Sequence, residues 1–519
     1  MFCATFYSYK GGVGRTLALA NVAAHLAMRG KKVLIVDFDL EAPGITTLDF
    51  CAAAQKHPGV VDFIHAYLRE GVAPNASDFI HCCGFTNGPD DTTIELHVMP
   101  AGDQSAAYGA SFAKIDWREL YEERDGFLLM EDLREQWKNL GYDYVLIDSR
   151  TGLTDVSGVC TRQLPDAVIT LFFPNQQNLA GLTDMVQSIR ASTARPHCPE
   201  LLFVASRLPR LDDEDGVLER WLERFKTQLG YSKQQFCALH QYDSLALLDQ
   251  EIFVRSRPKT GLAKQYVELS NLIAELNSED ADGAVAYIAS VGKVYSGKFN
   301  DPIVQFDISN PFGFQRIEKR LEEIEQQHRQ DCVVLGRLAE HYYSSRDFAH
   351  LEVVLRLGLA TNHTKTEGGI PDRLKPRMHL LQMRVSAETG DMDGVVGSAS
   401  SVLVSAGATE QMVVEALMSL VASAKEALPP PQDVVFFQTA DLTGISNVIR
   451  KFGRSSREAE YNCEIAFYTM QRFGSEIDSK FKSTIELALI AGGRFEEALK
   501  LLGESSAPNC SPSAPMAQI

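Results

Sequence analysis

A glycine-rich segment near the start of the chain places the strongest limit on its fold. It reads Lys10-Gly11-Gly12-Val13-Gly14-Arg15-Thr16 and stands between an apolar run, Phe2–Tyr7, and a helical pattern from Leu17 to Met28. Glycine carries no side chain, so the N–H groups of such a turn can point at phosphate oxygens, and the dipole of the following helix adds to the attraction. The segment therefore predicts a phosphate-binding loop, with the Thr16 hydroxyl as a Mg²⁺ ligand. A plain glycine-rich turn is the alternative.

Short apolar runs alternate with helical patterns from residue 1 to about residue 277. The runs of strand length are Phe2–Tyr7, Lys32–Val36, Tyr144–Ile147, Ala167–Phe173 and Leu201–Ala205. This alternation predicts an α/β domain with a mostly parallel sheet and helices on both faces.

Carboxylates follow two of these predicted strands. Asp37 and Asp39 come at the end of one run, and Asp148 directly follows another. Ligands of a parallel sheet bind at the carboxyl ends of its strands, so we expect these groups near the glycine-rich loop. One such aspartate is as often a helix cap as a catalytic group, but two beside a phosphate loop predict a nucleotide and Mg²⁺ site.

Together these motifs resemble the ParA/MinD family of deviant Walker A P-loop ATPases over about residues 1–275. The resemblance implies ATP and Mg²⁺ as cofactors and an ATP-dependent homodimer. By it, Lys10 reaches the partner's nucleotide, Asp39 orients the attacking water, and residues 149–152 form the second switch. The implied catalytic residues are Lys10 and Asp39, the nucleotide-binding ones Lys10, Gly11, Gly12, Val13, Gly14, Arg15, Thr16, Ser206 and Arg207, and the metal ligands Thr16 and Asp148.

The chain departs from the family pattern at several positions. Arg15 stands where the family has the P-loop lysine, and a planar guanidinium is not equivalent to an ammonium at a tight phosphate site. We therefore expect slow hydrolysis. Ser206 and Arg207 stand where the family recognises adenine with an asparagine, so the identity of the nucleotide base is left open. Asp37 fits a supporting role at the site and a purely structural role equally. The arginine form resembles the "KGGVGR variant" ATPases, which are fused to repeat modules in bacterial signalling and defence proteins.

The second half has a different pattern. The polar residues 277–283 mark a boundary and predict a linker over 278–315, and residues 316–504 read as helical. Three polar turns, at 345–348, 389–392 and 492–495, each open an amphipathic helix, and the last resembles a tetratricopeptide hairpin. Their irregular spacing favours an α-solenoid-like array, with a plain helical bundle as the alternative. We expect Phe348, Met392 and Phe495 in the hairpin cores and a disordered tail over 505–519.

Composition bears on partners and location. Acidic residues outnumber Lys plus Arg by 68 to 50, a net charge of −18, which disfavours binding to nucleic acid or an anionic membrane. The sequence shows neither a secretory leader nor an apolar run near the roughly 18 residues of a membrane span, so we expect a cytoplasmic protein. The segment His81-Cys82-Cys83 lacks a second ligand pair at zinc spacing, so a loop or core role is favoured over metal binding.

The leading hypothesis is an ATP-binding, slowly hydrolysing dimerisation switch whose helical C-terminal domain senses or recruits an unidentified protein partner. Two alternatives stay open. One is a nucleotide-binding scaffold that does not turn over, which the arginine at position 15 favours. The other is a DNA-partitioning or positioning ATPase, against which the acidic composition stands.

Overall fold

The structure is a computed structural model of the chain and describes residues 1–87, 92–192, 198–209, 215–242, 251–295, 311–361, 373–423, 428–452, 456–477 and 479–503. It divides into two compact units, one of residues 1–287 with 301–316 and one of residues 288–300 with 317–519. The predicted tail at 505–519 lies outside the described residues.

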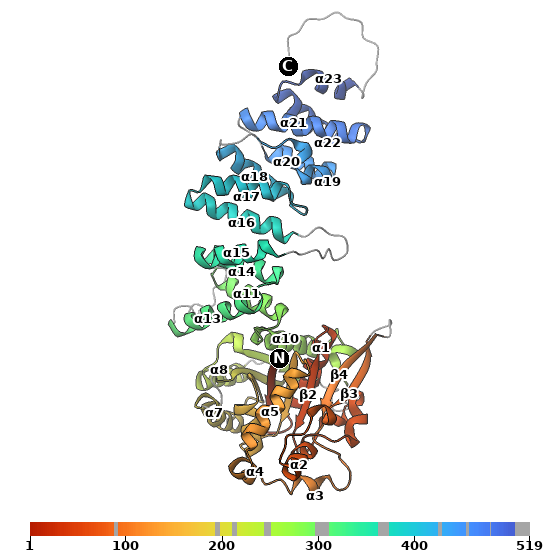
Figure 1. Cartoon of the computed structure of the whole chain (residues 1–519), viewed down its shortest axis with the longest axis vertical. Coiled ribbons are helices and arrows are strands. Elements are labelled where there is room, and N and C mark those ends of the chain that lie inside the picture. The colour runs from red at the N-terminus through yellow and green to blue at the C-terminus, as the bar shows by residue number, and fades with distance from the viewer. Residues whose placement is uncertain are drawn as a thin grey trace, which may run out of the picture. The chain divides into compact units, whose positions relative to one another are not determined.

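An eight-stranded sheet forms the centre of the first unit (Figure 1). Its strands are β1 Phe2–Tyr7, β2 Val33–Phe38, β3 His81–Asn87, β4 Thr92–Met99, β5 Tyr144–Ser149, β6 Ala167–Phe172, β7 Glu200–Leu208 and β8 Phe236–His240. They lie in the order β3-β4-β2-β5-β1-β6-β7-β8, and each neighbouring pair is parallel except β3 with β4. The prediction of a mostly parallel sheet is confirmed, and β3, β4 and β8 are additions to it.

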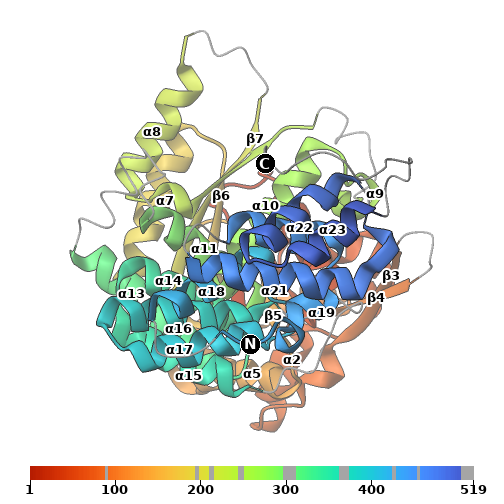
Figure 2. The same cartoon turned by 90° about the horizontal axis from the view of Figure 1, so that it is seen from above.

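Helices cover both faces of this sheet. They are α1 Arg15–Met28, α2 Val60–Glu70, α3 Tyr108–Phe112, α4 Trp117–Glu123, α5 Gly126–Asn139, α6 Asp155–Gly158, α7 Gln176–Arg190, α8 Val217–Leu229, α9 Phe253–Ser256 and α10 Gly261–Leu276. One core joins the sheet to α1, α9 and α10, and two others join its opposite face to α2 with α5 and to α7 with α8. Figure 2 shows α7 and α8 on one side of β6 and β7, with α9 and α10 on the other.

The position of α1 decides where the glycine-rich loop lies. Ala18, Ala20, Ala23 and Ala24 are fully buried, and their small side chains let the helix axis come close to the sheet. The helix begins at Arg15, directly after Gly14, so its N-terminus stands at the carboxyl end of β1. Parallel strands end at one edge of a sheet, which brings the ends of β2 and β5 to the same place.

The second unit is helical throughout its described residues. The helices described from residue 311 onward are α13 Pro311–Gln327, α14 Cys332–Ser345, α15 Phe348–Ala360, α16 Leu374–Thr389, α17 Met392–Leu403, α18 Glu410–Ser423, α19 Val435–Thr439, α20 Leu442–Lys451, α21 Ser456–Phe473, α22 Ser479–Ala491 and α23 Phe495–Gly503. From α14 to α23 they stack in chain order (Figure 1), and α14 pairs with α15 as α16 pairs with α17.

The polar turns predicted from the sequence join these helices. At the first turn, Arg346 has φ +60° and Asp347 accepts a hydrogen bond from the His350 N–H at 3.3 Å. At the second, Gly390 has φ +78° and Asp391 accepts one from the Gly394 N–H at 3.0 Å. A left-handed residue ends one helix, and the aspartate caps the next. The two devices together reverse the chain and so produce helical hairpins.

The prediction that Phe348, Met392 and Phe495 lie in the hairpin cores is wrong for two of them. Met392 is 43% and Phe495 59% exposed, and Phe348 is half-buried. Each is the first residue of its helix, one position after the turn, where the helix has not yet packed against its neighbour. The buried positions come about one turn later; they are Leu351 and Val354 in α15, Val395 and Ala399 in α17, and Ala498 and Leu501 in α23.

Part of the predicted linker, residues 278–315, is helical. Residues Ala281–Tyr295 form helix α11 and α13 begins at residue 311, whereas residues 296–310 lie outside the described residues. Asp280 accepts hydrogen bonds from the Asp282 and Gly283 N–H groups at the start of α11. Asp280 accepts a hydrogen bond from the Tyr144 hydroxyl at 2.6 Å and forms an ion pair with Lys31 at 3.1 Å. The polar residues around Asp280 predicted a domain boundary, but the Asp280 side chain attaches this segment to the sheet. In the part of the chain that the structure describes, no helix has the length and apolar composition needed to cross a membrane.

Candidate nucleotide site at the glycine-rich loop

The loop between β1 and α1 presents its backbone on one side. Gly12 and Gly14 have φ values of +77° and +78°, a conformation that side-chain-bearing residues rarely adopt. A Cβ placed on Gly11 or Gly14 would meet no atom within 4 Å, so this side of the loop is open. Among the described residues no side chain caps the first turn of α1. The first N–H groups of a helix have no partner within it, so this terminus suits an anion such as phosphate.

Arg15 lies at the centre of a buried cluster beside the loop. Its guanidinium donates through Nε to Asp148 and through Nη2 to Asp39, the latter at 2.6 Å. The Arg15 and Asp148 side chains are 8% and 0% exposed, and Asp39 is 16% exposed. Burial tends to lower the pKa of Arg15, but the two carboxylates raise it overall, so the guanidinium stays charged. Burial raises the pKa of Asp39, and Arg15 partly opposes that rise.

Thr16 joins the same cluster from the next position on α1. Its hydroxyl donates to Asp148 Oδ2 at 2.6 Å, so the two predicted metal ligands are in direct contact. A hydroxyl and a carboxylate are hard oxygen donors of the kind that Mg²⁺ prefers. The residues present therefore fit a Mg²⁺ site, with Thr16 and Asp148 to hold the ion.

Asp37 is fully buried next to these groups and holds the loop that carries Asp39. It accepts hydrogen bonds from the Asp39 N–H at 3.1 Å and the Ile45 N–H at 3.2 Å. In the sheet, Asp37 is the register partner of Asp148. Burial and the nearby Asp148 carboxylate raise the pKa of Asp37 well above its ordinary range. The sequence left a supporting and a purely structural role open for Asp37. These contacts favour the supporting role, because they hold the loop after β2 that carries Asp39.

The loop after β5 contacts the loop after β2 and the end of β1 through residues that the sequence motifs did not indicate. Arg150 forms an ion pair with Glu41 at 2.6 Å, and both side chains are partly exposed. The Tyr7 hydroxyl donates to the Gly152 carbonyl at 3.2 Å. The sequence signal for the ion pair of Arg150 with Glu41 was that two segments beside the predicted phosphate site carry opposite charges.

Ser206 and Arg207 meet the glycine-rich loop from β7. The Ser206 hydroxyl donates to the Val13 carbonyl at 2.8 Å, and Arg207 donates to the Gly12 carbonyl at 2.6 Å. Arg207 has φ +56°, at a register shift between β7 and β8. Such strained backbone persists only where surrounding contacts hold it. These side chains were predicted to lie near the base, and in the structure they contact the backbone of the loop itself.

Lys10 stands apart from the Arg15 cluster. It is exposed, and its Nζ lies 5.5 Å from the centroid of the Tyr9 ring. Tyr9 in turn packs on α7 at Gly181, where an added Cβ would come within 2.3 Å of the ring. Tyr9 thus fills the position that leads into the loop and supports the stem of Lys10 beside it.

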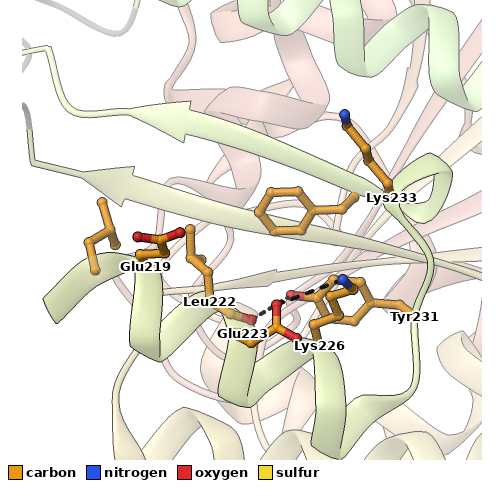
Figure 3. Close-up of a pocket in the computed structure, with 8 residues that line it drawn as sticks. Glu219, Leu222, Glu223, Lys226, Tyr231 and Lys233 are labelled. Carbon is orange, nitrogen blue, oxygen red and sulfur yellow. Dashed lines mark hydrogen bonds and ion pairs between the residues drawn. The ribbon is translucent and has the colours of Figure 1, made fainter. Parts of the chain in front are cut away.

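A cavity of about 370 Å³ lies elsewhere in the unit, between α8 and β8 (Figure 3). Its walls include Leu222 and Tyr231 together with Glu223 and Lys226, which form an ion pair at 3.7 Å. None of the residues that line it comes from the segment 10–16, so the cavity is separate from the phosphate loop.

Comparisons with known proteins agree with the resemblance seen in the motifs. Residues 3–197 match the profile of a family described as an AAA domain. The chain is 29% identical over 197 residues to the chromosome-partitioning ATPase Soj of Treponema pallidum, which covers 36% of this chain and 62% of Soj. It is 26% identical over 191 residues to the septum site-determining protein MinD of Escherichia coli K12, covering 36% of this chain and 58% of MinD.

Solved structures of the same class also match. MinD of Pyrococcus horikoshii complexed with Mg-ADP shares 18% identity with a TM-score of 0.37, covering 52% of this chain and 94% of that one. The ATP complex of a Cyanothece McdA variant shares 17% identity with a TM-score of 0.39, covering 53% and 96%. At these values the solved structures do not bear on function. The sequence matches support a ParA/MinD-type P-loop ATPase domain in the first unit, and the matched part spans about three fifths of Soj and MinD.

Proposed function

We propose that this chain binds ATP with Mg²⁺ at the glycine-rich loop and uses slow hydrolysis to switch between a monomer and a homodimer. The observation that carries the proposal is the cluster of Arg15, Thr16, Asp39 and Asp148 beside an open helix N-terminus. A relative named as an ATPase, Soj, matches the same part of the chain and supports it.

Each group at the site has a task that its position suits. The N–H groups from residue 11 onward bind the phosphates, and Thr16 and Asp148 hold Mg²⁺, which neutralises charge on the phosphate oxygens. Asp39 follows β2 at the edge of the cluster, where its carboxylate can orient a water towards the terminal phosphate. Asp37 fixes the backbone of that segment through the Asp39 N–H.

Arg15 makes the expected turnover slow. Its guanidinium is held by two carboxylates, so it has to leave at least one of them before it can reach a phosphate oxygen. Breaking a buried ion pair is costly unless another charge replaces the lost partner. Here the incoming phosphate can take the place of the carboxylates as the partner of Arg15. Mg²⁺ can then take the place of Arg15 as the partner of the carboxylates. Nucleotide and metal are therefore expected to bind cooperatively.

Dimerisation rests on Lys10. Its exposed ammonium lies against Tyr9 and outside the Arg15 cluster, so it is available to a nucleotide held by a second copy. The helical second unit would provide the output by binding a protein partner, since stacked helical hairpins leave an extended surface for binding. A partner shifts the switch only if it prefers one nucleotide state.

Two measurements on the full chain test the proposal. Titration calorimetry should detect ATP binding in the presence of Mg²⁺, and absence of any binding would reject the site. A phosphate-release assay should show slow turnover that Asp39→Ala abolishes while ATP binding is kept. Turnover at the unaltered rate in this variant would show that Asp39 has been given the wrong role.

A nucleotide-binding scaffold without turnover is the second candidate, and the Arg15 cluster favours it specifically. If the guanidinium keeps its bond to Asp39 with ATP bound, that carboxylate cannot orient water. Calorimetric binding without phosphate release would then identify the scaffold. Arg15→Lys would be expected to restore release, because a single ammonium occupies fewer acceptors than a guanidinium.

A further inference from the structure

The edge of the sheet away from the loop carries a cluster of metal-ligating side chains. The strands β3 and β4 pair there as an antiparallel hairpin (Figure 1), with Cys82 opposite His97 and Gly84 opposite Glu95. Alternate residues of a strand share a face, so Cys82, Glu95 and His97 project from the same side. A thiol sulfur, a carboxylate oxygen and an imidazole nitrogen of these residues all lie within 4.8 Å of one another.

A second observation at this place concerns His97. Its Nδ1 is buried and has no hydrogen-bond partner among the described residues. The ring packs edge-on against Tyr142, with the centroids 5.4 Å apart, which fixes the plane of the imidazole. Burial, together with the nearby Lys32, lowers the pKa of His97. A neutral imidazole can offer a nitrogen lone pair to a metal ion.

We propose that Cys82, Glu95 and His97 form a binding site for a divalent transition metal, Zn²⁺ first among them. A thiolate, an imidazole and a carboxylate are the three ligand types that Zn²⁺ takes in proteins, whereas Mg²⁺ and Ca²⁺ prefer oxygen alone. Binding releases the thiol proton of Cys82 to solvent as the sulfur–zinc bond forms. Three protein ligands leave the fourth tetrahedral position for water or for a group from a partner.

The site is separate from the nucleotide site. In the sheet, His97 is the register partner of Leu34, three residues before Asp37 on β2, and Cys82 lies one strand further out. Zinc here should therefore neither replace Mg²⁺ nor require nucleotide.

Neighbouring charges set the expected strength. Lys32 donates from Nζ to the Leu140 carbonyl at 2.7 Å and lies 5.0 Å from the Tyr142 ring centroid. Its positive charge acts on His97 and would oppose a cation there. Burial and the nearby Glu95 and Cys83 raise the pKa of the Cys82 thiol, so a metal has to displace its proton. We expect weaker binding than at a four-ligand structural zinc site, strengthening as the pH rises because the thiol must be deprotonated.

Cobalt substitution gives a direct test on the full chain, prepared reduced and freed of metal with a chelator. Co²⁺ should produce a sulfur-to-cobalt absorption band in the near ultraviolet and the visible bands of a tetrahedral ion, and Zn²⁺ should abolish both. Equilibrium dialysis should find one Zn²⁺ removed by Cys82→Ser and weakened at least about tenfold by Glu95→Gln, which retains an oxygen but loses the charge. Cys198→Ser is the matched control, because Cys198 is also an exposed thiol and lies outside the cluster.

The outcomes separate the alternatives. Loss of the bands in Cys82→Ser and their retention in Cys198→Ser would support the site. A sulfur band that survives Cys82→Ser would place the metal on another cysteine and overturn the proposal, as would absence of any band at a tenfold excess of Co²⁺. Circular dichroism of each variant shows whether it is folded. If Cys82→Ser does not fold, protection of Cys82 in the unaltered chain from iodoacetamide by Zn²⁺ gives the same answer, and equal alkylation with and without Zn²⁺ would refute it.

Discussion

Replacing Arg15 by methionine should destabilise the first unit strongly in the absence of divalent metal. Methionine keeps much of the apolar length of the side chain but removes the charge that lies between Asp39 and Asp148. Asp148 is fully buried and Asp39 is 16% exposed, so water cannot replace the guanidinium as the partner of either carboxylate unless the site rearranges. Asp37 is buried beside them, and burial and Asp148 already raise its pKa.

The expected cost follows from the burial of the pair. Removing one partner of a buried ion pair costs about 3–5 kcal/mol, because an uncompensated charge is left in the protein interior. In a domain of this size each kcal/mol corresponds to about 2 °C in melting temperature, so the loss should be roughly 6–10 °C. The control is Arg150→Met, which breaks the partly exposed ion pair with Glu41 in the same region. Such pairs contribute about 0–1 kcal/mol, so this variant should melt within about 2 °C of the unaltered chain.

The measurement can be confined to the first unit. The chain has three tryptophans, Trp117, Trp137 and Trp221, and all belong to that unit. Thermal unfolding followed by tryptophan fluorescence in a chelating buffer therefore reports on it without a tryptophan signal from the second unit. Adding Mg²⁺ should restore part of the loss in Arg15→Met, because a divalent cation can take the place of the guanidinium between the carboxylates.

The pH dependence gives a second readout with a definite sign. Burial raises the pKa values of Asp37 and Asp39 already in the unaltered chain, and without Arg15 the pKa of Asp39 should rise further. A carboxyl group with a raised pKa binds its proton more tightly in the folded than in the unfolded state, so its destabilising effect decreases as the pH falls. The gap between Arg15→Met and the unaltered chain should narrow from pH 7 to pH 5. A gap below 2 °C at pH 7, or one that widens on acidification, would refute this account of the cluster.

Further predictions concern the loop, the dimer and the helical unit. Lys10→Ala should still bind ATP but stay monomeric by light scattering, whereas a dimer in this variant would remove the basis for its role across the interface. Arg207→Ala should weaken ATP binding about tenfold by calorimetry, since it removes a charged hydrogen bond to the Gly12 carbonyl that holds the loop. Leu489→Ala should cost about 2–5 kcal/mol in urea unfolding followed by circular dichroism, because Leu489 is fully buried. Phe495→Ala should cost under about 1 kcal/mol, since its side chain is 59% exposed, and equal costs for the two would contradict this core.

The central strands were predictable because they are buried on both faces. β1, β2, β5 and β6 are buried at each position, and strands of that kind read as continuous apolar runs. The strands that the sequence did not predict lie towards the edges. β8 alternates between partly and fully buried residues, and β3 and β4 contain histidine, cysteine, threonine and glutamate among their apolar residues. Short segments of mixed polarity do not distinguish an edge strand from a loop.

The same pairing explains why the cluster at Cys82 was not visible in the sequence. Ligand spacing can be read along a chain only when the ligands share one turn or one strand. Cys82 meets Glu95 and His97 across the hairpin, and that pairing depends on the register of β3 with β4. The segment 81–83 contributes only Cys82, one of the three side chains of the cluster, so its sequence favoured a loop or core role.

The turns of the helical unit show a related limit. The glycine or polar residues and the aspartate that follows them identify where a helix begins, because they encode a left-handed residue and a cap. They do not identify which side of the new helix faces inward. Met392 stands directly after the cap and is exposed, whereas Val395 and Ala399 face the core one and two turns later. Helical periodicity has to be counted from the buried positions, not from the first apolar residue.

At the candidate nucleotide site, the motif predicts which residues meet but not which way a long side chain points. Arg15 follows a loop open to an anion and lies beside two carboxylates, so it has two sets of acceptors. Either the two carboxylates or the phosphate oxygens can accept hydrogen bonds from the guanidinium. Which of them Arg15 binds depends on whether phosphate and Mg²⁺ are present, because Mg²⁺ has to compensate the carboxylates that Arg15 leaves. A buried arginine that exchanges carboxylates for phosphate couples metal binding to nucleotide binding through one side chain.

A lysine offers a single ammonium in place of the planar fork and holds the carboxylates less firmly. Arg15→Lys should therefore reduce the cooperativity between Mg²⁺ and ATP in calorimetric titrations, and unchanged cooperativity would show that the coupling runs through other groups.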